Sequence, residues 1–335
     1  MQINIRDIWG YSARKAHKEY VANAVLRVKN KSSLMQEFLT LYGTRIATAT
    51  PPRLREIIGF VESLRFSIDD SQFSSFLAEC KSIFDYAKFS SKATEGWNAY
   101  SLCKLSKYRM CPYCQHASAF TLQRDSDKKG YRPTLDHYYP KGEYPYLSLS
   151  LYNLVPSCYS CNSSLKGQAN FYLDKHLHPF EHDEIIRYEW DIHSYLSARQ
   201  NSNAAGGESF SAGVKVRDIS SHAPYFHASR RTLDTFLIAE RLEISVEMLR
   251  SFFEVLLTIS PSRLAYINKE ILGQTNEKIT EESALQFSRK NYKNEWFGRL
   301  KADLLDAAWT HHQHGGNIIQ ATGRTSVVGG DIDHA

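Results

Sequence analysis

Four of the six cysteines in this 335-residue chain stand in two Cys-x-x-Cys pairs. The first pair is Cys111 and Cys114, in MCPYCQ, and the second is Cys158 and Cys161, in SCYSCN. Four thiolates presented by two such turns suit tetrahedral zinc, because two intervening residues let backbone amides turn toward both sulfurs. The interval between the pairs, residues 115–157, is longer than the roughly 15 to 20 residues of common four-cysteine ribbons. The spacing predicts a structural zinc site with a folded segment inserted between its halves.

Between and beside the cysteines stand residue types that can move protons or bind a hard cation. Asp136 and His137 are neighbours in TLDHYYP, Asn153 lies in LYNLVP, and Asn162 directly follows the last cysteine. An imidazole with a reference pKa of about 6.5 can exchange protons near neutral pH, and divalent cations such as Mg²⁺ prefer oxygen ligands. Each residue also has an ordinary interpretation. Alone, Asp136 would be a turn former beside a packed histidine, and Asn153 a strand-end residue.

Short elements must bring these side chains together. PTLDHYYP alternates like a strand that ends at the Asp-His pair, a loop follows through residues 141–146, and LYNLVP is typical of a second strand. In CNSSLKG, Asn162 or Ser163 can cap a short helix that contains Lys166. Strand, strand and helix around one metal ion form a ββα-metal arrangement.

These residues resemble the HNH endonucleases, in the subgroup whose nuclease finger is framed by two zinc knuckles, over about residues 108–170. The family pattern has an Asp-His pair, a central Asn and a final His or Asn; here these positions hold Asp136 and His137, Asn153 and Asn162. LDHYYPKGEYPYLSLSLYNLVPSCYSCN is also close to the nucleases of bacterial anti-phage systems such as Septu. In such systems an HNH protein acts beside an SMC-like or AAA-type ATPase.

The resemblance implies roles for hydrolysis of a phosphodiester. His137 would take a proton from water. Asp136 and Asn162 would bind one catalytic Mg²⁺ or Mn²⁺. Asn153 would hold the loop that orients His137.

Basic residues around this segment predict contacts with a polyanion. The net charge is +5, and the excess of basic over acidic residues is densest in residues 101–176; a surplus of this size is also common on a solvated face. Lys166 lies four residues after Asn162, on the same helix face, and is a candidate phosphate contact or charge stabiliser. Arg132 and Lys141 are candidates for contacts with the DNA backbone. The predicted partner is double-stranded DNA.

The flanks predict a mainly α protein with an embedded α+β element. Residues 1–102 form a helical N-terminal region, since PPRLREIIGFVESLRF and FSSFLAECKSIFDYAKF carry apolar residues at helical spacing. Residues 103–176 form the nuclease domain. Residues 177–310 form a mainly helical C-terminal region with a flexible loop at 198–213, and residues 311–335 a disordered tail.

Location and function follow as expectations. No apolar run approaches the roughly 18 residues of a membrane span, and the start, MQINIRDIWGYSARK, lacks an apolar signal core. We therefore expect a cytoplasmic DNA endonuclease that acts as the effector of an anti-phage system. Two alternatives stay open. One is a non-catalytic, zinc-stabilised DNA-binding or scaffold module, and the other is an RNA-cleaving toxin component.

Overall fold

The computed structural model describes residues 2–124, 129–191, 195–197, 214–218, 224–273 and 277–313. Within this part of the chain, helices dominate and the strands are few and short, as the sequence predicts. No helix among the described residues is long and apolar enough to cross a membrane. The chain divides into two compact units. The first contains Met1–Ile186, Asp218–Ile238 and Lys293–Phe297, and the second contains the intervening segments and the C-terminal part.

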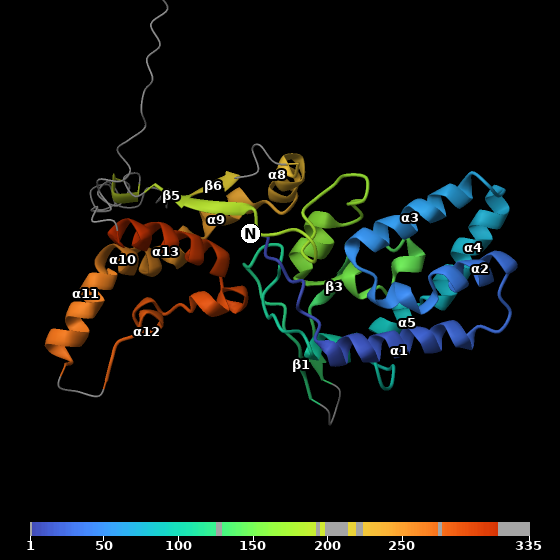
Figure 1. The fold of residues 1–335 in the computed structure, drawn as a ribbon, viewed down its shortest axis with the longest axis horizontal. Coiled ribbons are helices and arrows are strands. Elements are labelled where there is room, and N and C mark those ends of the chain that lie inside the picture. The colour runs from blue at the N-terminus through green and yellow to red at the C-terminus, as the bar shows by residue number, and fades with distance from the viewer. Residues whose placement is uncertain are drawn as a thin grey trace, which may run out of the picture. The chain divides into compact units, whose positions relative to one another are not determined.

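The first unit contains all the residues that the sequence singled out for chemistry (Figure 1). Its α-helices are α1 (Tyr11–Arg27), α2 (Ser33–Leu41), α3 (Pro51–Arg65), α4 (Asp70–Ile83), α5 (Tyr86–Ser90), α6 (Ala99–Lys104) and α8 (Phe226–Thr235). Its shorter helical turns are η1 (Gly43–Thr48), η2 (Pro145–Leu147), η3 (Leu151–Asn153) and η4 (Ser160–Lys166). Its strands are β1 (Leu122–Gln123), β2 (Gly130–Tyr131), β3 (Thr134–His137) and β4 (Leu154–Ser157).

PPRLREIIGFVESLRF forms the single helix α3, as its apolar spacing predicts, whereas FSSFLAECKSIFDYAKF is divided between α4 and α5. Pro51 stands in the first turn of α3, where a missing N–H leaves no intrahelical bond unmade, and Leu54 and Ile58 are fully buried. FSSFLAECKSIFDYAKF forms two helices, because Asp85 accepts a hydrogen bond from the Lys88 amide at 2.9 Å and begins a new helix there. The break places Tyr86 against His137, with ring centroids 4.4 Å apart.

A two-stranded ribbon is the centre of the predicted finger. β3 pairs with β4 in antiparallel register, with Asp136 opposite Val155 and His137 opposite Leu154. The chain then passes Cys158 and enters η4, a π-helical turn that ends at Lys166. Strand, strand and helical turn thus follow one another in the predicted order.

The N-terminal helices pack directly against this ribbon and its loop. Phe38 of α2 contacts both Phe76 of α4 and Tyr146 of η2, at ring-centroid distances of 5.3 and 6.0 Å. Arg55 of α3 binds both carboxylate oxygens of Glu181 at 2.6 and 2.7 Å. Four tyrosines in and just before the predicted loop are all buried and are therefore core residues. They are Tyr138, Tyr139, Tyr144 and Tyr146.

The second unit is a smaller set of helices with one strand pair. Its helices are α10 (Val246–Thr258), α11 (Pro261–Tyr266), η5 (Ile267–Ile271), α12 (Glu281–Leu285) and α13 (Gly298–Gln313). Four further elements lie mostly in this unit and have one end in the first: α9 (Ile238–Ile244), η6 (Arg289–Asn294), and β5 (Ile186–Trp190) paired to β6 (Val214–Asp218). The predicted loop at 198–213 lies outside the described residues. The predicted tail, 311–335, begins inside α13, and residues 314–335 lie outside the described part.

Candidate functional site

The four paired cysteines form one cluster. Cys111, Cys114, Cys158 and Cys161 are buried, and their sulfur atoms all lie within 4.8 Å of one another. The Sγ atoms of Cys114 and Cys158 are 4.0 Å apart. Sulfurs bound tetrahedrally at about 2.3 Å from one zinc ion stand roughly 3.8 Å from each other. The cluster is therefore positioned to bind a single metal ion, as the two Cys-x-x-Cys pairs predict.

Backbone amides support the cluster at both pairs. The His116 amide donates to Cys114 Sγ at 3.4 Å, and the Cys161 amide donates to Cys158 Sγ at 3.5 Å. Gln115 has a left-handed backbone, with φ of 46°, which turns the chain sharply after Cys114. A hydrogen bond from the Cys111 thiol holds the pKa of Cys114 well below its usual range. Because a thiolate is the form that binds metals, this environment favours the ligand state of Cys114, whereas burial raises the pKa of Cys111 in the same cluster.

A cavity of about 300 Å³ brings together most of the predicted functional residues. Residues from β3, the following loop and η4 contribute to its wall, and so do Tyr86 and Ser90 of α5. Six of the residues that the sequence singled out line it: Arg132, Asp136, His137, Lys141, Asn162 and Lys166. Residues 30 positions apart in the chain thus meet at one site, because the ribbon folds η4 back onto β3.

His137 is buried and held in one orientation. Its Nε2 lies 3.0 Å from the carbonyl oxygen of Ser148. A carbonyl oxygen only accepts hydrogen bonds, so Nε2 carries the proton and Nδ1 keeps a free lone pair. Burial lowers the pKa of His137 to about 3, against the opposing effect of the Ser148 carbonyl. The ring is therefore neutral at pH 7 and has one nitrogen able to accept a proton.

Asp136 forms a buried ion pair with Lys166. The Lys166 ammonium donates to Asp136 Oδ1 at 2.9 Å and to the carbonyl oxygen of His137 at 2.8 Å, and both side chains of the pair are 2% exposed. The Tyr113 hydroxyl donates to Asp136 Oδ2 at 2.6 Å. The sequence predicts Lys166 as a phosphate contact or a charge stabiliser, and in the structure its ammonium pairs with the Asp136 carboxylate.

Two residues at this cavity, Asp136 and Asn162, could offer oxygen ligands to a divalent cation. Each Asp136 oxygen accepts one hydrogen bond and so keeps a lone pair for a metal. Among the residues that the structure describes, none hydrogen-bonds to the half-buried side chain of Asn162, which lines the same cavity. A carboxylate and an amide oxygen are ligands that Mg²⁺ and Mn²⁺ accept. Such an ion would compete with the Lys166 ammonium for the Asp136 carboxylate.

Asn153 does not line the cavity but fixes the loop beside it. Its side chain accepts a hydrogen bond from the Tyr139 amide at 2.7 Å and donates to the carbonyls of Tyr139 and Leu147 at 3.1 and 3.2 Å. These bonds close the loop that begins after β3 and continues to Ser148, whose carbonyl accepts from His137. The side chain of Asn153 thus shapes the loop that orients the imidazole.

Two cations lie at the wall of the cavity in addition to Lys166. The Lys141 ammonium lies 4.6 Å from the ring centroid of Tyr86. Arg132 donates to the carbonyl of Pro133 at 2.8 Å and lies over the ring of Tyr100 at 5.4 Å. Three cations and one carboxylate therefore line the cavity, a balance that favours an anionic ligand.

The Lys166→Met substitution tests whether Asp136 can bind a divalent ion. Without the ammonium, a buried carboxylate loses its counter-charge, and we expect the free energy of unfolding to fall by about 3–5 kcal/mol in metal-free buffer. If Asp136 is a metal ligand, added Mg²⁺ or Mn²⁺ should restore stability to Lys166→Met more strongly than to the wild type. Chemical denaturation with and without each ion measures both effects.

Two controls accompany this experiment. Lys175→Met makes the same change at an exposed lysine and should behave as the wild type. Adding Asp136→Asn to Lys166→Met should remove the response to the ions. An equal response of Lys166→Met and wild type would contradict the assignment of Asp136 as a ligand.

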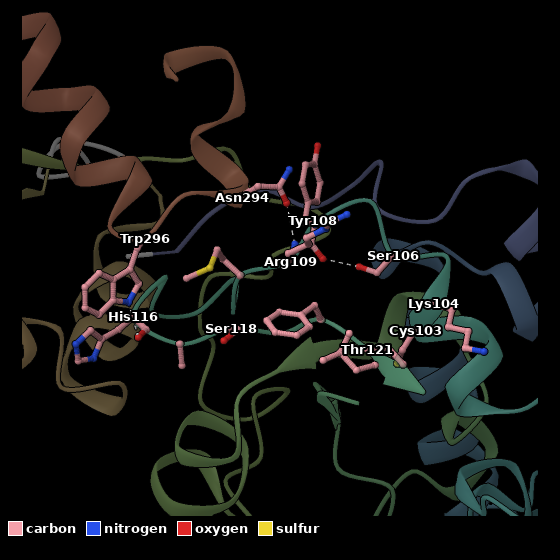
Figure 2. A pocket seen from close by; sticks show the side chains of 14 residues that line it. Cys103, Lys104, Ser106, Tyr108, Arg109, His116, Ser118, Thr121, Asn294 and Trp296 are labelled. Carbon is pink, nitrogen blue, oxygen red and sulfur yellow. Dashed lines mark hydrogen bonds between the residues drawn. The ribbon is translucent and has the colours of Figure 1, made fainter. Parts of the chain in front are cut away.

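A larger cavity of about 800 Å³ lies beside the first cysteine pair (Figure 2). Tyr108, Arg109 and Asn294 line one side of it in this view. The rings of His116 and Trp296 stack with centroids 5.8 Å apart. Its lining contains no Asp or Glu. Burial raises the pKa of its single cysteine, Cys103, to about 12, so no thiolate forms near neutral pH. This cavity therefore lacks the carboxylate that the smaller one places beside its histidine.

Sequence reasoning missed three partners of the predicted residues: Tyr113, Tyr86 and Ser148. Tyr113 lies inside the first Cys-x-x-Cys pair, and this position was the one signal that could have drawn attention to it. Tyr86 reaches the site from a different helix, and Ser148 contributes a backbone carbonyl. Neither contact has a sequence pattern of its own.

Comparisons with known proteins give one partial similarity. No family model matches the chain, and no solved structure matches it. Protein ea31 of Escherichia phage lambda is 30% identical over 96 residues. That similarity covers 28% of this chain and 28% of the length of the phage protein.

Proposed function

We propose that the protein is a metal-dependent endonuclease of the HNH type that hydrolyses DNA phosphodiester bonds. The observation that carries this proposal is the composition of one cavity, of about 300 Å³. A neutral imidazole, a carboxylate, a carboxamide and an ammonium group share its wall, from His137, Asp136, Asn162 and Lys166. A protein that only binds nucleic acid has no need of a buried proton acceptor beside an oxygen donor set.

His137 is the proposed general base. Its Nδ1 lone pair would take the proton of an attacking water while Nε2–H remains bound to the Ser148 carbonyl. Burial makes the free imidazole a weak base. The negative charge of a phosphodiester bound in the same cavity would raise its pKa again, because an anion stabilises the imidazolium.

Asp136 and Asn162 are the proposed ligands of a catalytic Mg²⁺ or Mn²⁺. When bound, such an ion supplies Lewis-acid stabilisation of negative charge on the phosphate and the leaving oxygen. Lys141 and Arg132 at the cavity wall would hold the DNA backbone through charge. Lys166 would contribute positive charge close to Asp136.

We further propose that the cysteine cluster binds zinc and that this zinc is structural. Four thiolates fill a tetrahedral coordination shell and leave no position for water or substrate. Asn162 directly follows Cys161, so the same turn that binds zinc would also position a ligand of the catalytic ion.

The proposed biological setting is the cytoplasm of a bacterium, as the nuclease effector of an anti-phage system. This part rests on the resemblance of residues 135–162 to the nucleases of systems such as Septu. An SMC-like or AAA-type ATPase is the partner that this resemblance suggests. Double-stranded DNA is the proposed substrate.

A cleavage assay tests the proposed function. The purified protein is incubated with supercoiled plasmid, single-stranded DNA and transfer RNA, in Mg²⁺, in Mn²⁺ and in EDTA. We expect plasmid cleavage with either ion, none in EDTA, and recovery when Mg²⁺ is added back while the zinc content stays constant. Binding of plasmid without cleavage would favour the non-catalytic module, and cleavage of transfer RNA alone would favour the toxin component.

A further inference from the structure

Two histidines hold consecutive residues of one buried loop. The loop joins η2 to η3, and the carbonyl of Ser148 accepts from His137 Nε2 at 3.0 Å. The carbonyl of the next residue, Leu149, lies 2.6 Å from Nε2 of His17. His17 belongs to α1, 132 positions earlier in the chain. The proposed base and a residue of the N-terminal helices are thus bonded to adjacent carbonyls.

The hydrogen bonds of His17 fix its own proton. Nε2 must donate, since the Leu149 carbonyl can only accept. On the other side of the ring, the Trp97 indole N–H donates to Nδ1 at 3.2 Å. Burial lowers the pKa of His17 to about 4, so the ring is neutral at pH 7. Both contacts require the same neutral form, with the proton on Nε2.

We propose that Trp97 and His17 are positioning residues for His137. They fix the Leu149 carbonyl and so fix the preceding Ser148 carbonyl, which determines the orientation and the protonated nitrogen of the base. Neither residue lines the cavity, so both act through the loop. The catalytic consequence rests on the proposed nuclease function, whereas the effect on the His137 ring does not depend on it.

A purely structural role for His17 is the competing explanation. Its ring packs against Phe89 and Tyr20, with centroid distances of 5.2 and 6.3 Å. Loss of packing alone would lower stability but would leave each folded molecule with a normally oriented His137. The test therefore needs substitutions that separate hydrogen bonding from packing.

Three substitutions make that separation. His17→Phe keeps an aromatic ring but removes the donor to Leu149. His17→Gln can donate to Leu149 and accept from Trp97 through its carboxamide, so it should restore function in part. Phe89→Leu perturbs the packing around the His17 ring and leaves all three hydrogen bonds in place.

Two measurements follow. Plasmid cleavage by His17→Phe should show kcat lowered by about 10- to 100-fold per folded molecule with KM nearly unchanged, because a misplaced base affects the chemical step. Nitrogen NMR of protein labelled with ¹⁵N-histidine should show His137 protonated on Nε2 in the wild type. In His17→Phe it should show a mixture of the two neutral forms.

The outcomes distinguish the two proposals. A His17→Phe protein with wild-type kcat and an unchanged His137 signal would overturn the positioning role, as would equal losses of kcat in His17→Phe and Phe89→Leu. If no variant and no wild-type protein cuts DNA, the nuclease proposal fails, while the NMR signal of His137 still decides the coupling. If His17→Phe does not fold, Trp97→Phe is the second variant. It removes the indole donor to His17 Nδ1 and is expected to shift the nitrogen NMR signal of His137.

Discussion

Removal of the metal ion from the four-cysteine cluster is expected to unfold the segment around residues 108–170. Zinc sites of this kind supply on the order of 10 kcal/mol of apparent folding free energy, which is comparable to the whole free energy of unfolding of a small domain. Hydrogen exchange measured before and after treatment with a strong zinc chelator should show loss of protection in β3, β4 and η4. Re-addition of zinc should restore it.

The effect should extend from the cluster to the cavity. Tyr113 lies between Cys111 and Cys114, and its hydroxyl binds Asp136 at 2.6 Å. Loss of the metal ion would therefore release a partner of the buried carboxylate. Asn162, which follows the last cysteine, would lose its position at the same time.

Substitution of single cysteines provides the matched comparison. Cys111→Ser should lower the bound zinc from one ion per chain and destabilise the segment. Cys80→Ser changes a buried cysteine that lies outside the cluster, so its zinc content should equal that of the wild type. Equal zinc content and equal stability in the two variants would contradict the metal site.

The His137→Ala substitution is expected to reduce DNA cleavage by about 100- to 10,000-fold, the usual contribution of a general base. The fold and the zinc content should be retained, because among the described residues the imidazole makes no bond to the cysteine cluster and hydrogen-bonds to the Ser148 carbonyl. Initial rates of plasmid cleavage in saturating Mg²⁺, together with zinc analysis and circular dichroism, provide the measurement.

His227→Ala serves as the control for His137→Ala. His227 is exposed and lies on α8, so its removal should leave the cleavage rate unchanged. A His137→Ala protein that cleaves plasmid at the wild-type rate would contradict the proposed role of His137 as the general base. A loss of cleavage that is accompanied by loss of zinc would instead indicate that the substitution had damaged the fold.

The features that the sequence predicted well are those encoded by neighbouring residues. The Cys-x-x-Cys pairs form a buried cluster, and the Asp136–His137 pair ends β3 as its alternation predicts. A short period or a fixed spacing is enough to place such residues on a turn or a strand. The roles of Asp136, His137 and Asn162 in catalysis stay predictions that the experiments above address.

The features that the sequence did not predict depend on contacts between distant segments. No periodicity indicates that His17 would bind Leu149, or that Tyr86 would pack against His137. The helical spacing of apolar residues continues across Asp85, but the capping bond of the Asp85 side chain begins a new helix there. Lys166 was predicted from its helix position, and only the fold shows that Asp136 is its partner.

The hydrogen bond between His17 and Leu149 joins residues 132 positions apart in the chain. This separation determines when the site can form during synthesis. The first helix emerges from the ribosome well before the loop to which it binds, and Glu181, the partner of Arg55, emerges later still. A nascent chain therefore carries no fixed His137 until Ser148 and Leu149 have been synthesised, and no complete cavity wall until Gln168 has been added. For a protein proposed to cut DNA, this delay would keep unfinished chains harmless to the cell that makes them.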